Sequence, residues 1–156
     1  MSVHEGGIAP DFTAESTEGT VTLSNVKANR IVLYFYPKDD TPGCTKEACS
    51  FRDHHQQLLD QGAKLFGVSV DSIKRHNNFR EKYELPFPLI ADPDHKIVTA
   101  YGLWGEKKFM GKTYMGVTRA TFILDGERRV LKAWPKVKPA NHGPEVLEAL
   151  AQLDES

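Results

Sequence analysis

Three stretches of the chain consist largely of aliphatic, β-branched and aromatic residues. They run from Ile31 to Tyr36, from Ala63 to Val70 and from Arg119 to Leu124. Apolar runs of this length are typical of strands that are covered on both faces. Helical patterns separate these runs, and the alternation predicts an α/β fold with a central sheet. A further short strand is expected from Pro88 to Ile90.

Apolar residues three or four positions apart predict the helices between these strands. The first is expected to open at Thr41 and Pro42, a residue that can cap followed by a proline whose missing N–H is tolerated there, and to continue to about Asp60. Its inward face is predicted to contain Cys44, Ala48, Phe51, His55 and Leu58. The other helices are expected after Asp71 or Ser72 with an end before Leu85, from His95 to Tyr101, and from about Pro144 onward.

Turn residues organise the remainder of the chain. The glycines between residues 102 and 116 predict a long loop or an irregular hairpin. This stretch contains four large side chains, those of Trp104, Phe109, Met110 and Tyr114. We expect them to cover the core rather than to line a pocket. Asp125 and Gly126 predict a tight turn between two antiparallel strands, and Pro135 and Pro139 interrupt the region that follows.

The length of 156 residues is typical of one domain, which we expect over residues 1–156. Lysine and arginine number 20 against 21 aspartates and glutamates, so the formal net charge of −1 provides no general attraction to nucleic acid. The longest apolar run is too short for a membrane-spanning helix, which needs about 20 residues. The first residues lack the pattern of a targeting segment. A cytoplasmic protein that binds neither nucleic acid nor membranes is expected.

The two cysteines, Cys44 and Cys49, form a CxxxxC pair. This spacing is neither the CxxC of a dithiol oxidoreductase nor half of a four-cysteine zinc site. On an ideal helix the two Cα atoms lie about 8.6 Å apart, whereas a disulfide needs less than about 7 Å. A bond between the two sulfurs therefore requires this part of the helix to unwind.

The two thiols are expected to differ in reactivity. Cys44 lies in the first helical turn, where unpaired N–H groups and the positive end of the helix dipole favour a thiolate. Cys49 has polar helical neighbours and is predicted to lie further outward. This asymmetry suits an attacking thiolate and a second thiol that resolves its oxidised product.

Other interpretations of the cysteines remain open at this point. Cys44 can be an inert apolar residue of the core. A metal site that combines a cysteine with His54 or His55 matches no standard spacing. A cysteine hydrolase needs a nearby imidazole, and nothing in the local sequence marks the candidates, His76, His95 and His142.

The segment from Phe35 to Asp53, FYPKDDTPGCTKEACSFRD, resembles the peroxidatic-cysteine region of the peroxiredoxins. The Pro-xxx-Thr/Ser-xx-Cys motif of that family falls on Pro37, Thr41 and Cys44. Cys49 is similar to the resolving cysteine of the bacterioferritin-comigratory-protein, or PrxQ-type, subfamily. The resemblance covers almost the whole chain and includes APDF near the start, VSVDS, FPLIADPD and YGLWGEKKFMGKTYMGVTRATFILD.

The resemblance implies a thioredoxin-like fold and a peroxidase that reduces hydrogen peroxide and organic hydroperoxides. It implies that Cys44 becomes a sulfenic acid, that Cys49 resolves it in an intramolecular disulfide, and that thioredoxin or a similar dithiol recycles the protein. Arg119 stands where the family has its active-site arginine, although the pattern alone indicates a strand-surface charge. Thr41 is expected to assist the reaction and Pro37 to exclude solvent. No metal or organic cofactor is needed, and a monomer is expected.

Glu47 is expected to complement the helix dipole rather than to donate a proton, and it lies outside the expected catalytic set. Two other classes of function stay open. One is a redox-responsive binding protein, in which oxidation of Cys44 and Cys49 changes a partner surface. The other is the thiol hydrolase. A thioredoxin-like disulfide reductase is disfavoured because the chain lacks CxxC.

Overall fold

The computed structural model describes residues 3–154, so the domain expected over residues 1–156 extends past the described part at both ends. The strands are β1 (Thr13–Ser16), β2 (Gly19–Thr22), β3 (Arg30–Phe35), β4 (Ala63–Ser69), β5 (Leu89–Ala91), β6 (Trp104–Phe109), β7 (Lys112–Val117), β8 (Ala120–Leu124) and β9 (Val130–Trp134). The helices are α1 (Pro42–Asp53), α2 (His55–Asp60), α3 (Ile73–Tyr83), α4 (Lys96–Ala100) and α5 (His142–Asp154), with 3-10 turns η1 (Leu23–Asn25) and η2 (Pro139–Asn141).

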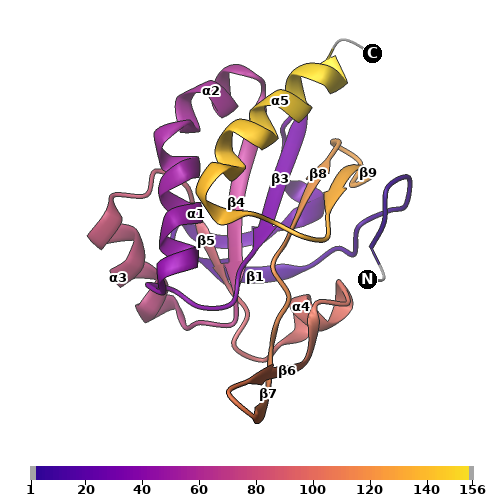
Figure 1. Cartoon of the computed structure of the whole chain (residues 1–156). Coiled ribbons are helices and arrows are strands. Elements are labelled where there is room, and N and C mark those ends of the chain that lie inside the picture. The colour runs from indigo at the N-terminus through magenta and orange to yellow at the C-terminus, as the bar shows by residue number, and fades with distance from the viewer. Residues whose placement is uncertain (1–2, 155–156) are drawn as a thin grey trace.

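The main sheet has seven strands in the order β2-β1-β5-β4-β3-β8-β9 (Figure 1). β3 pairs in parallel with β4, and β4 with β5, whereas β8 is antiparallel to both β3 and β9. Parallel neighbours need crossover connections, which α1 with α2 and then α3 provide. The predicted central mixed sheet flanked by helices is therefore confirmed.

Side chains of β3 alternate between two apolar layers, which explains its uninterrupted apolar sequence. Leu33 and Phe35 belong to the layer that contains residues of α4. Val32 and Tyr34 belong to the opposite layer, which residues of α1, α2, α3 and α5 complete. Cys44 lies in this second layer. Packing against the central strand therefore holds the helix that carries the candidate nucleophile.

The single helix expected to run to about Asp60 is in fact two helices, so that prediction is wrong. The backbone of His54, between α1 and α2, leaves the helical region with φ −116° and ψ 10°. Its ring nitrogen Nδ1 lies 2.8 Å from the carbonyl oxygen of Ser50, and its N–H donates to Phe51 instead. In an uninterrupted helix the N–H of residue 54 would donate to Ser50. The side chain of His54 thus replaces a helical hydrogen bond.

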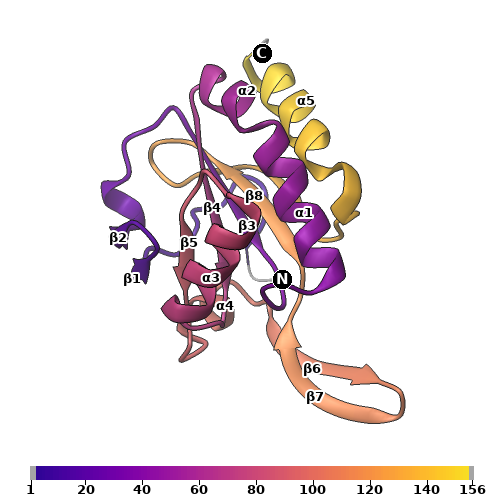
Figure 2. The same cartoon turned by 90° about the vertical axis from the view of Figure 1, so that its left-hand side faces the viewer.

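β6 and β7 form a regular antiparallel hairpin that projects from the body of the molecule (Figure 2). Met110 and Gly111 make its turn, and both have positive φ, as tight hairpin turns require. Trp104 packs against the core, but Phe109, Met110 and Tyr114 are 66%, 86% and 52% exposed. The prediction that these three residues cover the core is wrong, because the hairpin extends beyond the main sheet.

The connection between β8 and β9 is longer than the tight turn expected at Asp125 and Gly126. It spans residues 125–129, in which the N–H of Arg128 donates to the carbonyl of Asp125 and the N–H of Asp125 donates to the carbonyl of Arg129. The two strands are antiparallel neighbours, as predicted.

Caps and prolines mark several element ends at the expected positions. The hydroxyl of Ser72 accepts a hydrogen bond from the N–H of Arg75 at the start of α3. β9 ends immediately before Pro135, and Pro139 begins η2. By contrast, no apolar run in the sequence predicts β1 or β2. No helix within residues 3–154 is both long and apolar enough to cross a membrane.

Candidate active site

Cys44 lies in the first turn of α1. Thr41 is the N-cap residue, with extended φ and ψ of −92° and 157°, and Pro42 follows it in the first turn. Proline is tolerated there because the first N–H groups of a helix have no partner within the helix. Cys44 is only 1% exposed. Its sulfur is therefore shielded from bulk water at the positive end of the helix dipole.

Arg119 immediately precedes β8, and its Nη2 donates a hydrogen bond to Cys44 Sγ over 3.2 Å. The pairing of β8 with β3 places Ala120 opposite Phe35, so the start of β8 lies beside the end of β3. The chain continues from that end of β3 into α1. The register of the sheet therefore brings together two residues that are 75 positions apart in the sequence.

Glu47 contacts the other side of the Arg119 guanidinium. Its Oε1 accepts a hydrogen bond from Arg119 Nη1 over 2.6 Å, and its side chain is completely buried. Its Oε2 is buried without a hydrogen-bond partner among the described residues. Leaving a buried polar atom unpaired costs about 1–3 kcal/mol, so this placement is not expected for a residue that only supports the fold.

Glu47 lies outside the catalytic set expected from the sequence, and the structure places it in direct contact with Arg119. Cys44 and Glu47 are three residues apart on α1 and share one face of the helix. That spacing is the sequence signal that points to Glu47. It does not identify the partner, because Arg119 lies 72 residues further along the chain.

The charges of the site depend on burial. Burial raises the pKa of the Glu47 carboxyl to about 7, although Arg119 acts in the opposite direction. For Arg119, burial lowers the pKa, but the charges of Glu47 and Cys44 outweigh burial and the net pKa is raised. Arg119 therefore stays a cation, while the protonation of Glu47 changes near neutral pH.

The raised pKa of Glu47 predicts a pH dependence of folding stability. Between the ordinary value of 4.5 and about 7, the folded protein holds a proton that the unfolded chain has released. Stability from this group is therefore present below pH 4.5 and is lost as the pH rises through about 7. We expect the free energy of unfolding of the wild type, measured with urea relative to that of Glu47→Gln, to fall by on the order of 2 kcal/mol from pH 5 to pH 8. A difference that stays constant over this range would contradict the assignment.

A cavity of about 660 Å³ opens beside Cys44. Its lining contains four of the five residues predicted for the site, which are Pro37, Thr41, Cys44 and Arg119. Trp104, Tyr114 and Met115 of the β6–β7 hairpin line it as well. Pro37 is exposed. Trp104 and Tyr114 thus line the cavity, which was the less expected alternative for these two residues.

The Thr41 hydroxyl donates to the carbonyl of Lys38 over 2.8 Å. It makes no hydrogen bond to an N–H of α1, so the expected capping by this side chain is not observed. Since the hydroxyl proton is committed to Lys38, the oxygen is left to accept a hydrogen bond from a group in the cavity.

Cys49 lies further along α1 and does not line the cavity. It is half-buried whereas Cys44 is buried, which confirms the prediction that Cys49 lies further outward. Both are free thiols in the same helix. Near Cys49 this helix packs against α5, where the N–H of Gly143 donates to Ser50 Oγ over 2.9 Å. Unwinding of α1 would disturb that contact.

The alternative cysteine chemistries gain no support from the described residues. The candidate imidazoles His76, His95 and His142 contact Asp39, Trp104 and Thr121 respectively. Within residues 3–154, the group of metal-binding side chains that lie close enough to share an ion contains neither cysteine, and consists of Asp39, Asp71 and His76.

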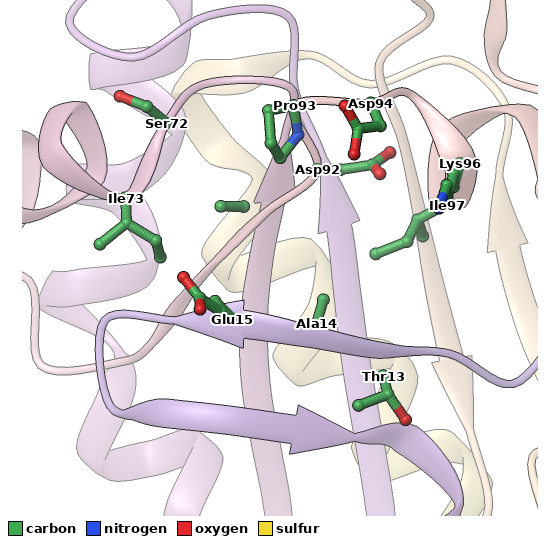
Figure 3. A pocket seen from close by; sticks show the side chains of 11 residues that line it. Thr13, Ala14, Glu15, Ser72, Ile73, Asp92, Pro93, Asp94, Lys96 and Ile97 are labelled. Carbon is green, nitrogen blue, oxygen red and sulfur yellow. The ribbon is translucent and has the colours of Figure 1, made fainter.

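A second hollow, of about 360 Å³, lies between β1 and the connection from β5 to α4 (Figure 3). Side chains of both signs line it, among them Glu15, Asp92, Asp94 and Lys96. None of the predicted site residues is in its lining. The candidate chemistry therefore belongs to the cavity beside Cys44.

Comparison with known proteins points to the same chemistry. Residues 6–133 match the model of the AhpC/TSA family. The chain is 47% identical over 156 residues to peroxiredoxin Bcp of Bacillus subtilis, with 99% of both chains covered, and 39% identical over 148 residues to peroxiredoxin Bcp of Escherichia coli K12, with 94% of this chain and 95% of the relative covered.

Solved structures extend the comparison to the fold. The bacterioferritin comigratory protein of Xanthomonas campestris, described with an alkyl peroxide reduction activity, superposes with a TM-score of 0.84 at 40% identity over 90% of both chains. A cysteine-to-serine mutant of Xylella fastidiosa PrxQ superposes with a TM-score of 0.88 at 32% identity, over 98% of this chain and 99% of the other. The predicted thioredoxin-like fold is confirmed.

Proposed function

Because the chain belongs to the AhpC/TSA family and is a peroxiredoxin, we propose that it reduces hydroperoxides with Cys44 as the nucleophile and Cys49 as the resolving thiol. The observation that carries this proposal is the 3.2 Å contact between Arg119 Nη2 and Cys44 Sγ, at a helix N-terminus and beside an open cavity. Arg119 thus places a positive charge against the sulfur that attacks the peroxide in this proposal.

The first step is a displacement at oxygen. The Cys44 thiolate attacks one peroxide oxygen, the S–O bond forms as the O–O bond breaks, and the electron pair leaves on the second oxygen. Sulfur is oxidised by two electrons and becomes a sulfenic acid, while the leaving oxygen takes a proton and departs as water or an alcohol. The site must therefore stabilise charge that moves from sulfur to the leaving oxygen.

Polar groups around the cavity match this movement of charge. Arg119 faces the sulfur, and the first N–H groups of α1 add the positive end of the helix dipole. The Thr41 oxygen is free to accept from the O–H of the peroxide and so to orient it. Pro37 has no N–H to compete for the substrate and restricts solvent at the edge of the cavity.

The second step forms the Cys44–Cys49 disulfide. The Cys49 thiolate attacks the sulfenic sulfur, the S–S bond forms, and the oxygen leaves with a proton as water. On an ideal helix the two Cα atoms lie about 8.6 Å apart, beyond the roughly 7 Å limit for a disulfide, so α1 must unwind between them. An external dithiol such as thioredoxin then reduces the bond by exchange and restores both thiols.

The cavity supports a range of hydroperoxides as substrates. Its lining includes the large apolar side chains of Trp104, Met115 and Val117, which suit organic hydroperoxides as well as hydrogen peroxide. The alkyl peroxide activity described for the Xanthomonas campestris relative agrees with this assignment. The resolving thiol lies in the same chain, so a monomer is sufficient, and the cycle requires a reducing compartment such as the cytoplasm.

The test is rapid quenching of reduced protein mixed with one equivalent of hydrogen peroxide, followed by intact mass and peptide mapping. We expect the wild type to lose the mass of two hydrogens, with the new bridge mapped to Cys44 and Cys49. Cys49→Ser should take up one oxygen on Cys44 at an unchanged rate and then stall, because no thiol is in place to resolve it. Continued dithiol-dependent cycling of Cys49→Ser at the wild-type rate would remove Cys49 from its role.

The rate of the first step separates the peroxidase from a redox-responsive binding protein. A free thiol treated in parallel sets the baseline. We expect Cys44 to react orders of magnitude faster than this thiol, because the site stabilises the transition state. Oxidation of Cys44 at the rate of the free thiol would contradict a peroxidase and favour the binding protein.

A further inference from the structure

The loop that leads from β3 to the nucleophile is held by one buried side chain. Of residues 37–40, Asp39 alone is buried, at 2% exposure, while its three neighbours are exposed. The same loop carries the backbone on to Thr41 and Cys44. The contacts of Asp39 therefore decide where this part of the active site lies.

Asp39 contacts a histidine of α3. Asp39 Oδ2 lies 2.6 Å from Nδ1 of His76, which is completely buried, and Asp39 Oδ1 accepts from the Tyr36 hydroxyl over 2.5 Å. The second ring nitrogen of His76, Nε2, lies 2.9 Å from the carbonyl oxygen of Ile90. Both ring nitrogens thus lie within hydrogen-bond distance of an oxygen. His76 and Asp39 form a buried, hydrogen-bonded pair.

A second carboxylate holds the backbone of the same residue. Asp71 Oδ2 accepts from the N–H of Asp39 over 2.9 Å and from the Ser69 hydroxyl over 2.6 Å. Arg75 Nε donates to Asp71 Oδ1 over 2.9 Å and balances its charge. Asp39 is thus bound through both its side chain and its backbone, to His76 of α3 and to Asp71 of the connection between β4 and α3.

The proximity of Asp39, Asp71 and His76 does not indicate a metal site. Their ligand atoms lie within 4.8 Å of one another. However, each carboxylate oxygen and each ring nitrogen of the three already has a hydrogen-bond partner in the protein. The polar atoms of the cluster are satisfied by hydrogen bonds within the protein.

Lys38, the residue before Asp39, connects the hydrogen bonds of Asp39 to the cavity. The carbonyl of Lys38 accepts the hydrogen bond of the Thr41 hydroxyl over 2.8 Å. This bond sets the direction of the Thr41 lone pairs, which face the substrate in the proposed reaction. A shift of Asp39 moves the peptide that contains this carbonyl and so turns the Thr41 hydroxyl.

We propose that Asp39 and His76 are positioning residues, whose buried hydrogen-bonded contact keeps the loop from Pro37 to Thr41 in the geometry that activates a peroxide at Cys44. This inference rests on the proposed peroxidase function. The pair does not touch the substrate. It acts through Lys38 and Thr41, so its loss should slow the reaction of Cys44 with peroxide more than its reaction with an electrophile that does not need Thr41.

The test compares two reactions of the same thiolate. The second-order rate constant of Cys44 with hydrogen peroxide is measured by stopped flow, and the rate constant with iodoacetamide is measured on the same samples. The variants are Asp39→Asn, which keeps the shape of the side chain but removes its charge, and His76→Gln. Asp40→Asn is the matched control, because the exposed Asp40 of the same loop also bonds α3, through Lys82 and Tyr83, and asparagine tolerates its φ of 60°.

We expect Asp39→Asn and His76→Gln to lower the peroxide rate constant by about ten-fold or more, since small displacements of positioning groups have effects of this size. The iodoacetamide rate constant should change by less than about two-fold, and Asp40→Asn should change neither by more than that. The double variant should lose little more than either single variant, because both side chains belong to one unit.

Two results would overturn the inference. One is a peroxide rate constant of folded Asp39→Asn close to that of the wild type, and the other is a parallel fall of both rate constants. If Asp39→Asn and His76→Gln do not fold, Tyr36→Phe decides the question, because it removes a single donor to Asp39; it should lower the peroxide rate constant alone, and an unchanged ratio of the two rates would contradict the proposal. A wild type that reacts slowly with peroxide would instead count against the proposed function itself.

Discussion

Cys44→Ser is expected to abolish peroxide turnover, with a loss of more than about 10⁴-fold, as removal of a catalytic nucleophile usually produces. A serine hydroxyl ionises far less readily than a thiol and has no sulfur to form a sulfenic acid. The fold should survive the change, because Cys44 is a small buried side chain and Arg119 Nη2 can donate to the serine oxygen in place of Sγ. The measurement is peroxide consumption in the presence of excess dithiol.

The matched control for this variant is Cys49→Ser, which removes the other thiol of the same helix. It should still consume about one equivalent of peroxide per chain before it stalls. Intact mass should show no added oxygen in Cys44→Ser and one in Cys49→Ser. Substantial peroxidase turnover by Cys44→Ser would refute the assignment of the nucleophile.

Arg119→Ala is expected to lower the rate constant of the peroxide step by about 100-fold or more, which is the usual effect of losing one preorganised donor. The variant loses the donor at 3.2 Å from Cys44 Sγ and leaves the buried carboxylate of Glu47 without its partner. Stopped-flow oxidation by hydrogen peroxide measures this rate constant.

Arg119→Lys and Arg129→Ala are the controls for this result. Lysine keeps the charge, but its single ammonium nitrogen does not reproduce the fixed geometry in which one Nη of arginine contacts Glu47 and the other contacts Cys44, so an intermediate rate is expected. Arg129 lies beyond the opposite end of β8, where it bonds the carbonyl of Gly6, and its replacement should leave the rate unchanged. A wild-type rate constant in Arg119→Ala would show that the contact has no catalytic role.

Local patterns predicted the elements that carry the chemistry. The apolar run from Ile31 to Tyr36 is a strand because both of its faces are covered, and Pro42 marks the start of α1 because a helix does not use the first N–H groups. The same spacing argument placed Cys44 inward and Cys49 further outward, as observed. These features depend on neighbours within a few residues.

Patterns failed where a distant or unusual contact decides the outcome. The break at His54 depends on a side chain that takes the place of a backbone donor, which no apolar periodicity reveals. Phe109 and Met110 have large apolar side chains of the kind found in protein cores, yet they are exposed in a hairpin that extends beyond the sheet. Glu47 has the appearance of an acid that only complements the helix dipole until Arg119 is brought next to it.

The sequence by itself determined the α/β class and the helix that begins beside Cys44, and the resemblance to the peroxiredoxins pointed to Pro37, Thr41 and Arg119, which line one cavity. Tertiary structure alone decided which polar and charged groups lie next to these residues. The contacts of Arg119 with Cys44 and of Asp39 with His76 join residues 75 and 37 positions apart. Such contacts depend on which strands pair and which faces are buried together. The role of a carboxylate or an imidazole can be inferred only when its partner residue is known.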